Sequence, residues 1–517
     1  MESRSSVFKR GLFTLAGGLV LGTVVAWLSP GEWLRGWLAA SFICWISLFC
    51  LASAWKWGGG GKTLAWMMTL AFVLRLGAGI YLTLALPTHG YDDPQQNAGY
   101  VFTDAYRRDT EAWGFTLSAT PLWDIFKAEL DTDQYGGLLI LSGILYRYLS
   151  PDAHRPLLII LLAASFAALG VPFLHRAVCQ RWEQTLADLT CWILVLYPDS
   201  ILFGSSQMRE PFLIGLLCIA FWGIVNWRQN RYTAAAAFLI GWSGMMVFST
   251  RMGIAALAFL IVWLWLEDLL PKSSAWQWLG WVSLCLAGAG VVVLGWQWLH
   301  TTAAWDILLT ERNSGRVQTA ISELAGGRFG PQFIVIYGLA QPVLPAAIAE
   351  PALALWKTIA IMRSLGWYAL APFLLYGIFS VWKAQPGAEK RILIWVAIFT
   401  FAWLLISSMR AGGDQWDNPR YRMVFLPFLA LLAAWAALRA LHLRDLWLVR
   451  WFVVEAVFLG FFTAWYFSRY FQVGKRLPFW HMVAWIAALS ALVLLSGVVW
   501  DLGRNFLKRR QNRIHRL

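Results

Sequence analysis

The chain has 517 residues, of which 59% are hydrophobic and only 14% are charged, and its mean hydropathy is +0.57. A soluble domain carries roughly a quarter charged residues, so this composition excludes a soluble globular protein. The net charge of +14 does not indicate nucleic-acid binding, because the basic residues are scattered through short loops and the tail Arg504–Arg516. Such a distribution is typical of membrane orientation and contact with anionic lipid.

Apolar runs of about 20 residues recur along the whole chain, and this length suffices to cross a hydrocarbon core of about 30 Å. The runs do not alternate polar with apolar residues, which excludes a transmembrane β-barrel. We therefore predict an all-α polytopic membrane protein with about 14 transmembrane helices. The expected spans are 11–28, 37–55, 63–86, 157–178, 184–198, 210–227, 233–250, 252–268, 276–299, 360–382, 391–408, 421–438, 451–471 and 478–501.

The first run follows Lys9 and Arg10 but precedes no small-residue cleavage site, so we expect a retained span and not a signal peptide. The basic loops of the chain all fall on one side of this scheme, which assigns both termini to the cytoplasm. The opposite, outer side receives loops 87–156 and 300–355 and the shorter segments around 197–210, 249–251 and 409–419. The apolar segment 136–149 is short, and we expect it to lie in or dip into the outer interface.

Cysteine chemistry does not contribute a site. The six cysteines lie within or at the ends of apolar segments, with no CxxC pair and no neighbouring histidine, which argues against disulfides and a zinc site. Walker A, GxGxxG, HExxH and GxSxG motifs are also absent from the sequence.

The outer loop 87–156 holds the only long acidic stretch of the chain. A chain so poor in carboxylates is expected to use one or two of these for chemistry. Asp104 has Arg107 and Arg108 at i+3 and i+4, which favours a surface ion pair. A partly desolvated carboxylate at the interface can instead serve as a general base, so Asp104 is the first catalytic candidate and Asp109 the second. Asp133 either binds a sugar hydroxyl or, as we favour, caps the following helix.

Several charged residues fall on the predicted outer side, where the usual enrichment of Lys and Arg in cytoplasmic loops does not account for them. Arg209 and Glu210 immediately precede an apolar run, and charges at that depth are costly unless they pair or face a cavity. Arginines on the outer side can bind a lipid phosphate through two parallel hydrogen bonds, with contact to anionic lipid as the alternative. The outer arginines and the tyrosine between two of them are Arg251, Arg410, Arg420, Tyr421 and Arg422.

The order of these segments resembles integral-membrane GT-C glycosyltransferases, and more narrowly the branch of protein mannosyltransferases and the lipid A aminoarabinose transferase. The similar segments are Asp104 and Tyr106 in the first outer loop, Tyr197–Phe212, and Pro419–Pro427. They cover about residues 63–440. The chain departs from the family in having one more span before the acidic loop and no paired acid at Asp104.

The resemblance implies an inverting transfer of a hexose or pentose from a polyprenyl-phosphate donor to an extracytoplasmic lipid, glycan or protein, in a bacterial inner membrane. Asp104 would be the base, Glu210 would match the acidic residue after the next outer turn, and Arg420 or Arg422 would lie near the donor phosphate. We expect two N-terminal helices in 1–62, a catalytic module in 63–440, and C-terminal helices with a basic tail in 441–517. No residue spacing demands a metal, and participation of a divalent cation stays open. The alternatives are a lipid-linked-oligosaccharide flippase or an O-antigen ligase or polymerase.

Overall fold

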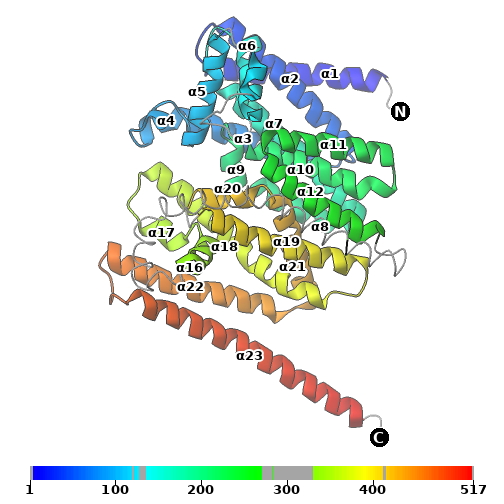
Figure 1. The fold of residues 1–517 in the computed structure, drawn as a ribbon, viewed down its shortest axis with the longest axis vertical. Helices are drawn as coiled ribbons and strands as arrows, with labels where there is room; N and C mark the ends of the chain where they lie inside the picture. Colours follow the sequence, from blue (N-terminus) through cyan, green and yellow to red (C-terminus); the bar gives the residue numbers. More distant parts are fainter. Residues whose placement is uncertain are drawn as a thin grey trace.

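The computed structural model of the protein describes residues 4–118, 121–126, 136–269, 282, 330–411 and 415–514. All regular secondary structure in these residues is helical (Figure 1). The prediction of an all-α membrane protein is confirmed at this level.

Eleven helices of the described residues are long and apolar enough to cross a membrane, and a bent pair brings the number to as many as twelve. Of the remaining predicted spans, 233–250 corresponds to α11 (Arg231–Phe248), which is helical but less apolar, and 276–299 lies outside the described residues apart from Val282. The eleven helices are α1 (Arg4–Trp27), α2 (Trp33–Trp57), α3 (Lys62–His89), α7 (Leu157–Arg181), α10 (Glu210–Val225, extended by η2, Asn226–Arg228), α12 (Thr250–Leu264, extended by η3, Trp265–Leu269), α18 (Ala354–Ser380, extended by η4, Val381–Lys383), α19 (Ala388–Ala411), α21 (Leu426–Leu443), α22 (Leu446–Tyr470) and α23 (Phe479–Ile514).

The bent pair consists of α8 (Gln184–Leu196) and α9 (Pro198–Gly204), whose axes differ by 56°. Pro198 favours a new helix start because its ring fixes φ and it has no N–H to leave unpaired. The break frees carbonyl groups at the end of α8, and the buried guanidinium of Arg75 donates to two of them, those of Leu194 and Val195. Arg75 also donates to the Ser200 hydroxyl at 2.6 Å, so this charge stabilises the bend.

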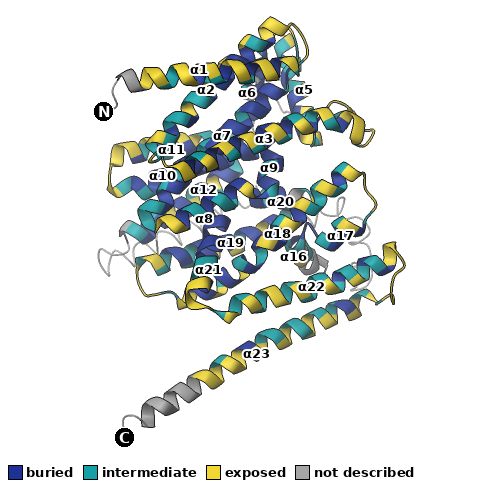
Figure 2. Ribbon diagram, turned by 180° about the vertical axis from the view of Figure 1, so that it is seen from behind, coloured by how far each residue is buried: buried dark blue, intermediate teal, exposed yellow. Residues whose placement is uncertain are grey.

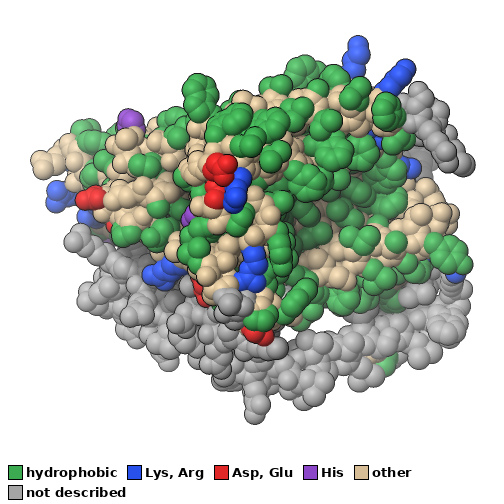
Figure 3. Space-filling model, turned by 90° about the horizontal axis from the view of Figure 1, so that it is seen from above, with side chains coloured by type: hydrophobic (Ala, Val, Ile, Leu, Met, Phe, Trp, Pro, Cys, Tyr) green, Lys and Arg blue, Asp and Glu red, His purple; other side chains and the backbone are tan. Residues whose placement is uncertain are grey.

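The core of the bundle consists of α7, α10 and α21, while α22 and α23 lie at its edge and bury few of their residues (Figure 2). At the α7–α10 crossing, a Cβ on Gly215 would lie 2.3 Å from the carbonyl oxygen of Phe166, so only glycine permits this approach. Figure 3 shows another face on which hydrophobic side chains dominate and charged ones are few. A bilayer is the solvent that suits such surfaces.

The acidic loop folds into short helices that lie beside the spans. They are α4 (Pro94–Asn97), α5 (Thr103–Leu117), η1 (Leu122–Phe126) and α6 (Gly137–Leu149). With 13 residues, α6 is too short to cross a core of about 30 Å at about 1.5 Å per residue. This length agrees with the expectation that 136–149 does not span.

The two termini lie on the same side of the bundle, as Figure 1 shows, and α4 and the α22–α23 turn lie on the opposite side. This arrangement is consistent with an even number of crossings. Part of the predicted loop 300–355 is helical, in α16 (Gly330–Ala340) and α17 (Leu344–Ala349). The remaining short helix, α20 (Asp417–Met423), precedes α21 and contributes to the candidate site.

Candidate functional site

Three charged residues from distant parts of the sequence meet in one group, which we call the Asp104 cluster: Asp104, Glu210 and Arg420. The Arg420 guanidinium donates from Nη1 to Asp104 Oδ2 and from Nε to Glu210 Oε1, both at 2.7 Å. Asp104 lies in the first turn of α5 and Glu210 is the first residue of α10. Both helix N-termini favour a negative charge, which helps to keep the two acids ionised.

The members of the Asp104 cluster differ sharply in accessibility. The Asp104 side chain is 53% exposed, whereas those of Arg420 and Glu210 are 9% and 3% exposed. Among the described residues only Oδ2 of Asp104 accepts a hydrogen bond, so Oδ1 is left to accept from an incoming molecule. The cluster therefore presents one reachable carboxylate, which is fixed by a buried ion pair.

Two opposing effects act on the pKa of Asp104. Burial raises it, whereas the charge of Arg420 and its hydrogen bond lower it. Arg108 and Arg209 add positive charge nearby, and the pKa lies below its ordinary value of 3.8 as a result. Asp104 is therefore ionised at neutral pH, which is the protonation state a general base needs.

A second group, the Arg363 cluster, consists of Asp199, Arg363 and Arg422. Asp199 is completely buried and pairs with Nε of Arg363, while Nη2 of Arg363 donates to the Gln415 carbonyl at 3.2 Å. Arg422 donates to the Gln341 carbonyl at 2.6 Å, and its guanidinium carbon lies 3.7 Å from the centre of the Trp367 ring. Burial lowers the pKa of Arg422.

The two clusters are joined by aromatic side chains. Trp416 lies 4.2 Å below the guanidinium of Arg363 and contacts Phe102, two residues before Asp104, edge to face. Phe102 in turn stacks on Phe203 of α9 at 4.9 Å. The Arg363 cluster and the Asp104 cluster therefore share one packed wall.

An apolar groove of about 470 Å³ runs along this wall between α3, α9 and α18; we call it the α3–α18 groove. Leu82, Leu202 and Ile359 line it and also pack in the hydrophobic cluster that includes Phe102 and Trp416. Arg363 lines it too, and within the described residues its Nη1 makes no hydrogen bond. The groove thus offers an apolar channel with a cation in its wall.

Asp109 does not join the Asp104 cluster. Its side chain is 2% exposed and accepts hydrogen bonds from the hydroxyls of Tyr100 and Tyr146, and it also contacts Nε2 of His154 at 2.9 Å. Burial and the charge of Asp109 raise the pKa of both tyrosines, which keeps them protonated as donors. In this position Asp109 ties α5 to α6.

The three other predicted arginines of the site lie at helix ends, and one of them, Arg209, is near the Asp104 cluster. Arg209 is half-buried at the start of α10, and its charge acts on both acids of the Asp104 cluster. Arg410 lies in the last turn of α19, 4.5 Å from the centre of the Tyr421 ring. Arg251 is half-buried in the first turn of α12. Asp133 lies outside the described residues.

Sequence reasoning missed Arg363 as a site residue and did not select Asp199 from the segment that contains it. The signal was present for Arg363, because it is a charge inside an apolar run, where ionisable residues are costly and usually functional. The predicted local partners of Asp104, Arg107 and Arg108, were also incomplete. The hydrogen-bonded partner is Arg420, 316 positions away.

No metal centre is evident in the described residues, where no group of three or more His, Cys, Asp or Glu side chains could hold an ion. The described cysteines are free thiols. The expectation that no histidine neighbours a cysteine was wrong for Cys179, whose Sγ lies 3.8 Å from Nδ1 of His175 one helical turn away. No protein-family model and no curated protein matches the chain. The assignment of function therefore depends on the chemistry of the two clusters and the groove.

Proposed function

We propose that the protein is a membrane glycosyltransferase that moves a sugar from a polyprenyl-phosphate donor to a hydroxyl group of an extracytoplasmic acceptor. The observation that carries this proposal is the Asp104 cluster. An exposed, ionised carboxylate is held by an arginine that is itself anchored on a buried glutamate. Its three members come from the three segments that carry the resemblance to GT-C glycosyltransferases.

In this mechanism Asp104 Oδ1 accepts the proton of the acceptor hydroxyl. The hydroxyl oxygen forms a bond to the anomeric carbon while the bond from that carbon to the phosphate oxygen breaks. The electron pair leaves with the polyprenyl phosphate, so an in-line attack inverts the anomeric centre. Arg420 and Glu210 act as positioning residues, because they contact Asp104 and each other instead of the reacting atoms.

The α3–α18 groove suits the donor's isoprenoid chain. It is mostly apolar, and Arg363 in its wall keeps Nη1 available for a phosphate oxygen. A guanidinium favours phosphate because it is always charged and presents several donors in one plane. Arg420 is a poorer phosphate ligand than the sequence suggested, because two carboxylates already occupy it.

The flippase alternative gains little support from the charges inside the bundle. A transporter needs polar side chains that face a path across the bilayer. Arg75 instead donates hydrogen bonds to carbonyl groups and Ser200, and Nε of Arg363 pairs with Asp199. These charges stabilise a bend and a groove wall.

The test is an assay of the purified full-length protein in lipid nanodiscs with radiolabelled polyprenyl-phosphate sugars and a panel of acceptors. Asp104→Asn should lower turnover by about 10²- to 10⁴-fold, the usual contribution of a general base. Asp92→Asn is the matched control, since Asp92 lies in the same loop and its side chain accepts a single hydrogen bond among the described residues, from the exposed Asn97 side chain. Full activity of Asp104→Asn, or equal loss in Asp92→Asn, would refute the assignment.

A further inference from the structure

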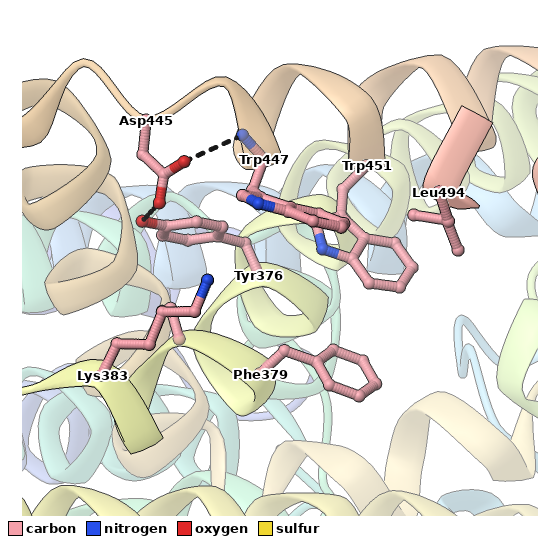
Figure 4. A pocket seen from close by; sticks show the side chains of 8 residues that line it. Tyr376, Phe379, Lys383, Asp445, Trp447, Trp451 and Leu494 are labelled. Atoms are coloured by element: carbon pink, nitrogen blue, oxygen red, sulfur yellow. Dashed lines mark hydrogen bonds between the residues drawn. The ribbon is translucent and has the colours of Figure 1, made fainter. Parts of the chain in front are cut away.

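A separate cavity of about 290 Å³ lies between the end of α18, the start of α22 and the middle of α23 (Figure 4). We call it the α18–α22 cavity. Its walls are largely aromatic, formed by Phe379, Trp447 and Trp451, and Leu494 of α23 closes one side. None of its lining residues belongs to the Asp104 cluster, the Arg363 cluster or the α3–α18 groove.

Two opposite charges face this cavity. Asp445 Oδ1 accepts from the backbone N–H of Trp447 at 3.1 Å, and Oδ2 accepts from the Tyr376 hydroxyl at 2.9 Å. A carboxylate offers about four acceptor positions, so half of its capacity remains. The Lys383 ammonium lies 5.6 Å from the centre of the Trp447 ring and makes no ion pair within the described part of the chain.

The cavity lies at the ends of two candidate spans, which is where lipid headgroups are expected. Lys383 ends the span Ala354–Lys383, and Asp445 directly precedes the span Leu446–Tyr470. Tryptophan is enriched at this depth, where its ring is apolar and its N–H reaches a polar partner. The Trp447 indole N–H donates to Asp501 at 2.7 Å in this way. Because few residues of α22 and α23 are fully buried, membrane lipid can reach the cavity from their side.

We propose that the α18–α22 cavity binds the headgroup of a phospholipid that carries a primary amine, a phosphoethanolamine group. The ammonium would donate to the free acceptor positions of Asp445, and the phosphate would accept from Lys383. The acyl chains would then lie against Phe379, Trp451 and Leu494. This site goes beyond the proposed transferase activity and does not depend on it.

The charge pattern favours this headgroup over the other common ones. A quaternary choline has no N–H to donate to Asp445, and a phosphoglycerol headgroup brings no positive charge to it. Arg450 adds a second positive charge near Trp447, since its guanidinium carbon lies 4.8 Å from the centre of that ring. The bound lipid would link the peripheral α22–α23 hairpin to α18.

The experiment is native mass spectrometry of the delipidated full-length protein with phosphatidylethanolamine, phosphatidylcholine or phosphatidylglycerol of identical acyl chains. We expect one phosphatidylethanolamine to bind at least about tenfold more tightly than the other two, as expected for one hydrogen bond between charged groups. Asp445→Asn should remove this preference. The variant should keep its fold, because asparagine is also a good N-cap residue for α22. Lys383→Gln should weaken all three lipids by about tenfold, because all carry the phosphate.

Glu389→Gln and Lys390→Gln, in the first turn of α19 outside the cavity, are the matched charge controls and should bind as the wild type does. Equal affinity for the three lipids, a preference for phosphatidylglycerol, or an unchanged preference in Asp445→Asn would overturn the proposal. If Asp445→Asn does not elute as a monodisperse protein, Lys383→Gln carries the test, because the Lys383 side chain makes no hydrogen bond in the described residues. Unchanged lipid affinity in that variant would overturn the proposal equally.

Discussion

Replacing Arg420 by Gln removes two ion pairs of very different environment. The pair with Asp104 is half-exposed, and exposed pairs contribute on the order of 1 kcal/mol or less. The pair with Glu210 is buried, and removing one partner of such a pair costs about 3–5 kcal/mol because a buried charge is left without compensation. The free energy of unfolding should therefore fall mainly through the effect on Glu210.

A second substitution separates this charge effect from lost packing. Glu210→Gln in the Arg420→Gln background removes the uncompensated charge, so the double variant should recover more than half of the lost stability. Transfer activity should stay low in both variants, because Asp104 loses the side chain that orients it. The measurement is equilibrium unfolding in mixed micelles, together with the transfer assay. A double variant no more stable than Arg420→Gln would contradict the reasoning.

Three other predictions concern the same region. Because the pKa of Asp104 lies below 3.8, its ion pair contributes stability above that pH and loses it as the pH falls through the lowered pKa. Activity should not fall with decreasing pH until the pH is below 3.8, and in Arg420→Gln this loss of activity should begin at a higher pH. The same pH dependence of activity in both proteins would count against Asp104 as the base. Arg363→Lys should raise KM for the donor by about tenfold, leaving KM for the acceptor unchanged, because lysine cannot keep the paired geometry; equal changes in both constants would remove Arg363 from the donor site. Asp109→Ala should destabilise the protein by about 1–3 kcal/mol for each stranded tyrosine hydroxyl while the folded fraction stays active, and lost activity at wild-type stability would make Asp109 catalytic.

The long apolar runs could be predicted from the sequence because the cost of burying a backbone polar group in lipid acts locally along each helix. The short helices of the acidic loop were harder to predict from the sequence, because their position depends on contacts between distant residues, such as that of Tyr146 with Asp109. The bend before Pro198 had a local signal, but its stabilisation by Arg75 comes from another helix.

The pairing within the Asp104 cluster is a clearer example of a contact that local sequence patterns do not predict. Spacing rules for a single helix favour Arg107 and Arg108 as partners of Asp104, because residues three and four apart are neighbours. The structure instead gives Asp104 a partner from α20, since the fold brings Arg420 and Glu210 to the start of α5. No pattern within one segment predicts a contact between residues so far apart in the sequence. The family resemblance gave each of the three residues a role, but it did not predict that Arg420 pairs with Asp104 and Glu210.

The helix α20 connects the two clusters through residues on opposite sides. Each residue of an α-helix turns by about 100°, so Arg420 and Arg422 point about 200° apart. Arg420 holds the carboxylates of the Asp104 cluster, and Arg422 packs on Trp367 toward the Arg363 cluster. Trp367 and Arg363 both belong to α18, so α20 connects the proposed base to the helix that carries the proposed phosphate ligand and constrains the distance between them. An in-line displacement requires such a fixed distance, because acceptor and leaving group must lie on opposite sides of the anomeric carbon. This is why we assign Arg420 to the base and Arg363 to the donor, although the sequence places Arg420 and Arg422 in one segment.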